Sequence, residues 1–99
     1  MSWATNYMMK LDKGLTISFR PRGNSMKPKI NSGDLVTVSP DTSKLDVGDI
    51  VLCKVKGYAF LHLISAIKGD QYQISNNRGH VNGWTSIKQI FGKVIDISA

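Results

Sequence analysis

One serine and one histidine of this 99-residue chain have the surroundings that nucleophilic chemistry needs. Ser25 lies in a turn bounded by a glycine and a proline, in the sequence Arg-Gly-Asn-Ser-Met-Lys-Pro-Lys at residues 22–29. His62 lies in the apolar run Phe-Leu-His-Leu-Ile at residues 60–64. A serine hydroxyl is a poor nucleophile until a base accepts its proton, and a neutral imidazole can accept one near pH 7. The pair therefore predicts attack on a carbonyl by Ser25, with His62 as the general base.

The turn around Ser25 suits this role, although a structural interpretation is also open. Gly23 allows close approach of the backbone and Pro28 restricts the exit of the turn, so Ser25 can present its hydroxyl and its amide to a carbonyl. Serines in such turns often only satisfy local hydrogen bonds. Likewise, His62 shares a strand face with apolar neighbours and could be a core histidine with one hydrogen bond.

The elements that must position these residues are mostly short strands. Runs that are β-branched or alternate in polarity are separated by turn pairs such as Gly69-Asp70. Gly33-Asp34 and Gly48-Asp49 each precede such a run, and their aspartates suit turns. The pattern predicts a mainly β fold, a compact antiparallel sandwich or partly open barrel. The expected strands are residues 16–19, 35–38, 50–55, 60–67, 71–74 and 91–97.

A short helix is expected before the first strand. Ser2 can cap it, Gly14 would stop it, and an apolar stripe recurs at helical spacing over residues 2–11. We expect residues 1–14 to form a helical arm packed on a β domain of residues 15–99; an arm that binds a partner is the alternative. The stripe consists of Trp3, Tyr7, Met8 and Leu11.

The charge balance points to an acidic partner without choosing its class. Thirteen Lys and Arg oppose seven Asp and no Glu, for a net charge of +6. The densest group of cations surrounds the serine turn: Arg20, Arg22, Lys27 and Lys29. A solvated basic surface and a nucleic-acid groove both fit this distribution.

Other chemistries have little support. The single cysteine, Cys53, lies in an apolar segment, so we expect a buried, inert thiol, no internal disulfide, and neither metal nor cofactor. No apolar run approaches the roughly 18 residues of a membrane span, and the N-terminus lacks the pattern of a secretory signal. We therefore expect a soluble, cytoplasmic protein without a membrane partner.

The order of several motifs resembles the LexA and signal-peptidase superfamily of serine peptidases. The resemblance covers residues 19–97, and its Ser-Met-x-Pro and two Gly-Asp-apolar elements are the most specific parts. The matching strings are Gly-Asn-Ser-Met-Lys-Pro-Lys-Ile-Asn-Ser-Gly-Asp-Leu-Val at 23–36, Leu-Asp-Val-Gly-Asp-Ile-Val at 45–51, Leu-His-Leu-Ile at 61–64, Ile-Ser-Asn-Asn at 74–77 and Phe-Gly-Lys-Val at 91–94.

The resemblance implies a β-rich catalytic fold in which Ser25 attacks a peptide carbonyl. LexA-like members use a lysine as the base, whereas this chain has His62 at the corresponding distance, as in the endoplasmic-reticulum and archaeal signal peptidases. A neutral imidazole accepts a proton near pH 7 without first losing a charge, so the substitution is chemically sensible.

The chain departs from this pattern where the Ser/His signal peptidases have Gly-Asp-Asn. It has Ile-Ser-Asn-Asn at residues 74–77, so no carboxylate is evident to orient the imidazole, and Asp70 suits that role poorly. Asn76 or Asn77 could hold the ring or polarise a substrate carbonyl, and both also suit a turn. Asn24 and Met26, which flank the serine, are further candidates for orienting or substrate-binding residues.

The backbone near the serine and one later segment complete the candidate site. Because residue 23 is glycine, the oxyanion would need the Ser25 amide and a second backbone donor. Residues 77–84, with two glycines and Trp84, are typical of a binding loop. In such a loop Arg78 and Trp84 could engage a peptide or a nucleotide base, and His80 would be exposed.

Three functions follow from these features. The first is a minimal serine peptidase or peptidase-like protein with a Ser25–His62 dyad that acts on a peptide or protein. The others are a non-catalytic protein-binding module and a basic nucleic-acid-binding domain. We expect neither a self-cleaving repressor nor a membrane-anchored signal peptidase, because no helix-turn-helix, Ala-Gly cleavage segment or anchor is evident; small bacterial and phage domains are the nearest kind.

Overall fold

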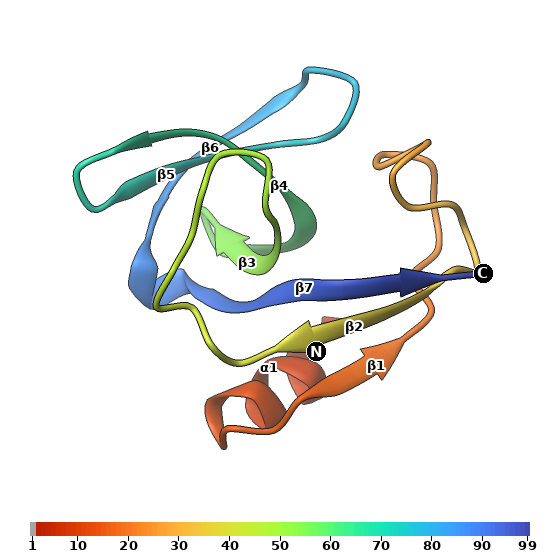
Figure 1. Ribbon diagram of the computed structural model, residues 1–99. Coiled ribbons are helices and arrows are strands. Elements are labelled where there is room, and N and C mark those ends of the chain that lie inside the picture. Colours follow the sequence, from red (N-terminus) through yellow and green to blue (C-terminus); the bar gives the residue numbers. More distant parts are fainter. Residues whose placement is uncertain (1) are drawn as a thin grey trace.

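A computed structural model describes residues 2–99, so Met1 of the expected helical arm lies outside the described residues. Seven antiparallel strands form one open sheet in the order β1-β2-β7-β3-β4-β5-β6, with a short helix on one face (Figure 1). The mainly β fold with an N-terminal helix is therefore confirmed. The elements are α1 (Thr5–Asp12), β1 (Ile17–Phe19), β2 (Leu35–Ser39), β3 (Ile50–Val55), β4 (Tyr58–Lys68), β5 (Gln71–Ser75), β6 (Val81–Ser86), the 3₁₀ turn η1 (Ile87–Gln89) and β7 (Ile90–Ser98).

The central strand β3 is buried on both faces because the sheet has an apolar cluster on each side. Ile50 and Leu52 join the cluster beneath α1, whereas Val51, Cys53 and Val55 join the opposite one. Successive side chains of a strand point to opposite faces, so a strand covered on both sides has a continuous apolar sequence. Burial raises the pKa of the Cys53 thiol to about 12, in line with the expected inert thiol.

Helix α1 packs on the sheet through its apolar stripe, but it begins later than the sequence predicts. Met8 and Leu11 are buried in the first cluster, and the residue at the N-cap is Ala4 rather than Ser2. The Ser2 hydroxyl instead accepts the Ala4 amide in a preceding turn. The helix stops at Gly14 as expected, because that residue adopts a left-handed φ of 83° and its amide donates to the Leu11 carbonyl.

All six predicted strands are present, and a seventh replaces much of the expected binding loop. Strand β6 covers residues 81–86, which contradicts the prediction of a loop through Trp84. The sequence pattern did not indicate this strand because several of its side chains are polar and it contains Gly83, which adopts a φ of 141°. Pairing with β5 nevertheless extends the sheet, and the Thr85 hydroxyl donates to the Lys54 carbonyl at 2.8 Å. The sheet thus curls until β6 approaches β3.

Four strand pairs contain one register shift each, and one of these shifts lies where β6 meets β5. Ile74 pairs with Gly83 and Ser75 pairs with Val81, so Asn82 is an extra residue opposite no single partner. Such a β-bulge bends its strand and redirects the side chain of the extra residue. The bulge therefore gives Asn82 an orientation that regular alternation would not have given it.

Over residues 2–99, no helix combines the length and apolar character required to cross a bilayer.

Candidate active site

Ser25 lies at the surface of the long turn between β1 and β2. The turn is anchored to the core because Met26 and Ile30 are buried in the first apolar cluster. The Ile30 amide also donates to the Met26 carbonyl at 3.0 Å. At its base the Gly33 amide donates to the Pro21 carbonyl at 3.1 Å. Anchored neighbours thus hold an exposed hydroxyl in place. Met26, a candidate for substrate contact, serves mainly as this anchor.

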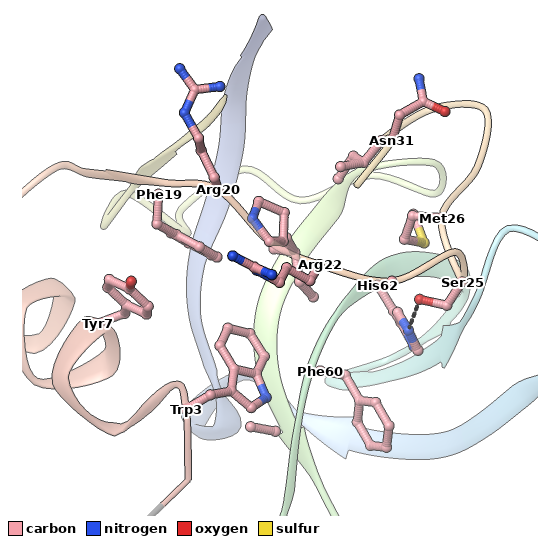
Figure 2. A pocket seen from close by; sticks show the side chains of 15 residues that line it. Trp3, Tyr7, Phe19, Arg20, Arg22, Ser25, Met26, Asn31, Phe60 and His62 are labelled. Atoms are coloured by element: carbon pink, nitrogen blue, oxygen red, sulfur yellow. Dashed lines mark hydrogen bonds between the residues drawn. The ribbon is translucent and has the colours of Figure 1, made fainter. Parts of the chain in front are cut away.

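His62 comes from β4 and faces the serine. Its backbone pairs with Val51 of the central strand, and its side chain is only 8% exposed. Nε2 of the imidazole lies 3.1 Å from Oγ of Ser25 (Figure 2). Two residues far apart in the sequence are therefore within hydrogen-bond distance, as attack with a general base requires.

Asn82, from the bulge in β6, holds the other side of the imidazole. Its Oδ1 lies 2.7 Å from Nδ1 of His62. An amide oxygen only accepts, so the proton of the neutral ring lies on Nδ1, which donates to Asn82. Nε2 then carries a lone pair directed at the Ser25 hydroxyl, and that hydroxyl donates to it. The three side chains form one directional chain of hydrogen bonds.

The surroundings of His62 favour its neutral form. Burial lowers the pKa of the imidazole below its usual 6.5, the hydrogen bond to Asn82 opposes this shift, and the nearby His80 lowers the pKa further. Phe60 stacks on the ring with the centroids 5.0 Å apart. A ring with a lowered pKa is unprotonated near pH 7, which is the state that a base must have.

A cleft opens beside the pair and extends toward the N-terminal helix. It has a volume of about 470 Å³. Ser25 and His62 line one end, and Trp3, Tyr7 and Phe19 line the other (Figure 2). The hydroxyl is therefore reachable by a ligand that fills the cleft.

Comparison with known families supports the resemblance drawn from the sequence. A family model described as Peptidase S24-like matches residues 3–95. The chain belongs to the Peptidase S24-like family. The resemblance to the LexA and signal-peptidase superfamily is thereby confirmed, and it extends to the N-terminal helix. No curated protein matches the chain.

The S24-like domain uses its other candidate asparagines to shape turns rather than to hold the imidazole. Oδ1 of Asn76 accepts the amides of Arg78 and His80 at 2.8 and 3.0 Å. Asn77 ties the β5–β6 turn to the serine turn: its backbone amide donates to the Ser25 carbonyl at 2.9 Å, and its Nδ2 donates to the Lys27 carbonyl at 2.8 Å. An asparagine does bond the ring, but it is Asn82.

The remaining candidates of the S24-like domain make no hydrogen bond to the imidazole, whose ring nitrogens face Asn82 and Ser25. Asn24 is exposed, and its carbonyl accepts the Lys27 amide. Asp70 is exposed in the β4–β5 turn. His80 is exposed, as expected, and Trp84 is 43% exposed on β6 and does not line the cleft.

Metal ligands do not gather in this S24-like domain. In the part of the chain that the structure describes, His, Cys, Asp and Glu form no group of three that could hold a metal ion.

Sequence reasoning missed Asn82 for a specific reason. It lies in the segment expected to be a loop, and its contact with His62 arises from a bulge in strand pairing. One weak signal was present: Val81, Trp84 and Thr85 are β-branched or aromatic residues, which are the types that strands favour.

Proposed function

We propose that this S24-like domain is a serine endopeptidase that hydrolyses peptide bonds with Ser25, His62 and Asn82. The observation that carries the proposal is the hydrogen-bonded chain Oγ–Nε2 and Nδ1–Oδ1, which opens on a cleft. A serine with a base, and a base with an orienting group, is the arrangement that recurs in unrelated acyl-transfer enzymes, including one type with asparagine in the third position.

The mechanism follows from the direction of these hydrogen bonds. Ser25 Oγ attacks the carbonyl carbon of the substrate while its proton passes to Nε2 of His62. The resulting imidazolium keeps its proton on Nδ1, which still donates to Oδ1 of Asn82. Nε2 then donates its proton to the leaving amine as the carbon–nitrogen bond breaks. Water later attacks the acyl-enzyme with His62 again as the base, which releases the second product and restores Ser25.

Backbone amides of the serine turn are available for the oxyanion. Among residues 2–99, no backbone carbonyl accepts the amide of Ser25, whereas the carbonyl of the same residue is bonded to Asn77. A free amide beside the nucleophile is the type of donor that stabilises a tetrahedral oxyanion. This amide, together with a second backbone donor of the turn, is our candidate.

A fluorophosphonate probe tests the proposal without knowledge of the substrate. The probe reacts with serines whose hydroxyl is activated by a base, so we expect mass spectrometry to find the adduct on Ser25. Ser25→Ala and His62→Ala should each abolish labelling and peptide hydrolysis while circular dichroism stays unchanged. Ser86→Ala, which removes the hydroxyl of a serine that does not line the cleft, is the matched control. Equal labelling of the wild type and His62→Ala would show that His62 is not the base.

A protein-binding module on the same fold is the second candidate function. It is favoured by the neutral third residue, since the amide of Asn82 cannot offset an imidazolium charge as a carboxylate does. It predicts a partner that remains bound to Ser25→Ala, together with a wild-type protein that fails to react with the probe. Labelling at Ser25 would count against this candidate.

A further inference from the structure

The end of the cleft farthest from Ser25 is walled by aromatic rings. Tyr7 of α1 stacks on Phe19 of β1 with the ring centroids 4.3 Å apart, and Trp3 packs obliquely on Phe19 at 5.9 Å. Trp3 remains 52% exposed. An exposed indole at the edge of a cleft offers a large apolar face to a ligand. The position of α1 on the sheet thus supplies an apolar subsite.

The same end of the cleft is cationic. Arg20 and Arg22 line it, and no carboxylate does. The guanidinium of Arg20 donates to the Gly33 carbonyl at 2.7 Å, so that side chain is already engaged. The guanidinium of Arg22 lies between Trp3 and Phe19 in Figure 2, and within residues 2–99 the only salt bridge is elsewhere, between Lys93 and Asp49. Arg22 is therefore available to a ligand carboxylate.

We infer that this end of the cleft is a specificity subsite for peptides that carry an aromatic side chain next to an acidic one. The aromatic side chain would pack against the exposed indole of Trp3, which Phe19 supports from the core side, and the carboxylate would accept hydrogen bonds from Arg22. The volume of about 470 Å³ falls within the range of ligand pockets and exceeds the space that a single small side chain needs. The inference rests on the proposed function, because it takes a peptide to be the occupant.

A peptide fits the cleft better than a nucleic acid does. Stacking rings and an arginine also suit a single-stranded nucleotide, but the other end of the cleft holds a hydroxyl and a base arranged to attack a carbonyl. Binding of a nucleic acid in the cleft is therefore one of the results that would contradict the inference.

The test measures binding separately from cleavage. The full chain with Ser25→Ala is titrated with fluorescent peptides of one host sequence that contain Phe-Glu, Phe-Gln or Ala-Glu at the same position. We expect the Phe-Glu peptide to bind about ten-fold more tightly than either relative, since charge-assisted hydrogen bonds and aromatic contacts each contribute on this scale. A short single-stranded oligonucleotide serves as a competitor.

Matched variants assign the preference to the subsite. Arg22→Gln should remove the preference for Glu over Gln, and Trp3→Ala should remove the preference for Phe over Ala. Lys29→Gln loses the same charge from the same turn but does not line the cleft, and Trp84→Ala removes an exposed indole of β6. Both controls should keep the two preferences.

The outcomes separate this inference from the proposed function. The subsite is supported if the Ser25→Ala protein prefers the Phe-Glu peptide and if adding Arg22→Gln or Trp3→Ala removes the corresponding preference. This holds even when the wild type fails to react with the fluorophosphonate. Labelling of Ser25 in the wild type, with equal affinity for all three peptides, overturns the subsite and leaves the peptidase intact. Displacement of the Phe-Glu peptide by the oligonucleotide at equal concentration also overturns it.

Discussion

At the scale of single residues, the identity of residue 82 sets how strongly His62 can act as a base. The amide oxygen of Asn82 fixes the tautomer and the orientation of the imidazole. It carries no charge, so it stabilises the imidazolium of the transition state less than a carboxylate does. The arrangement therefore supplies correct geometry with a modest electrostatic contribution.

Substitution of Asn82 separates these two contributions. Asn82→Ala leaves the ring without its partner, and we expect the rate of fluorophosphonate labelling to fall roughly a hundred-fold. Asn82→Asp keeps the acceptor and adds a charge, so labelling should be at least as fast as in the wild type. Asn6→Ala, an exposed position on α1, is the control. Unchanged rates in both Asn82 variants would show that the hydrogen bond has no role in activation.

The pKa of His62 predicts the pH dependence of activity. Because burial lowers this pKa below 6.5, the neutral ring is the major form at pH 6.5 and above. The labelling rate should therefore decline with a midpoint below pH 6.5, as the ring gains a proton. In Asn82→Asp the nearby carboxylate should raise the pKa and move the decline to higher pH. A wild-type decline centred above pH 6.5 would contradict the lowered pKa.

The same shift predicts a stability change with a definite sign. The unfolded imidazole gains a proton at pH values near 6.5, whereas the folded one gains it only at lower pH. Between the two pKa values the unfolded state binds more protons, so the free energy of unfolding decreases as pH falls through this window. His62→Gln should remove this part of the slope in urea unfolding measured from pH 7.5 to 5. An identical slope in the variant would contradict the prediction.

At the scale of elements, the candidate site joins two segments that the strands alone would not hold together. The serine turn follows β1, the β5–β6 turn lies on the far side of the sheet order, and Asn77 bonds one to the other. Asn82 and Asn77 thus come from the same hairpin. This hairpin positions both the imidazole of His62 and the turn that carries Ser25.

Asn77→Ala tests the connection between the two turns. The variant loses the hydrogen bond from Nδ2 to the Lys27 carbonyl, so the serine turn should be held less firmly and the labelling rate should fall about ten-fold. The pH at which activity declines should not move, because His62 is untouched. Asn24→Ala removes an exposed amide from the serine turn and should change little. Equal rates for the two variants would exclude a positioning role for Asn77.

The packing of β2 against β7 leaves no room for a side chain at one glycine of β7. A Cβ at Gly92 would lie 2.6 Å from Cγ1 of Val38 and 2.8 Å from the Ser39 carbonyl. We expect Gly92→Ala to lower the free energy of unfolding by about 1–3 kcal/mol, measured in urea. Ile95→Ala, exposed on the same strand, should cost less than about 0.5 kcal/mol. A stable Gly92→Ala would show that β7 can shift away from β2 at no cost.

At the scale of the whole molecule, the net charge of +6 acts on encounter with a ligand. Cations around the serine turn lie next to the cleft, so they attract acidic peptides before contact is made. The nucleic-acid alternative uses the same charge but predicts an equilibrium affinity that falls steeply with salt for any sequence. Rates of binding distinguish the two interpretations.

Stopped-flow measurements with the acidic peptide give the corresponding prediction. Between about 50 and 200 mM salt, the association rate should fall several-fold while the dissociation rate changes little, because screening acts mainly on approach. A neutral peptide of the same length serves as the control. An association rate independent of salt would show that the charge does not steer peptides.

Much of this protein was determined by the sequence alone. The Ser-Met-x-Pro turn, the base in an apolar run and the Gly-Asp strand starts led to the family and to the pair Ser25 and His62. Six strands followed from alternation and turn residues, and the helical stripe followed from its spacing. These signals are local, since each depends on residues within one turn or one strand.

Only the tertiary structure decided which groups complete the site. Asn82 meets His62 because β6 pairs with β5 through a bulge, Asn77 reaches the serine turn across the sheet, and Trp3 meets Phe19 because α1 packs on β1. Each contact joins segments whose separation is set by strand register and by the curl of the sheet. Register depends on how whole strands pair, so a short stretch of sequence does not specify it.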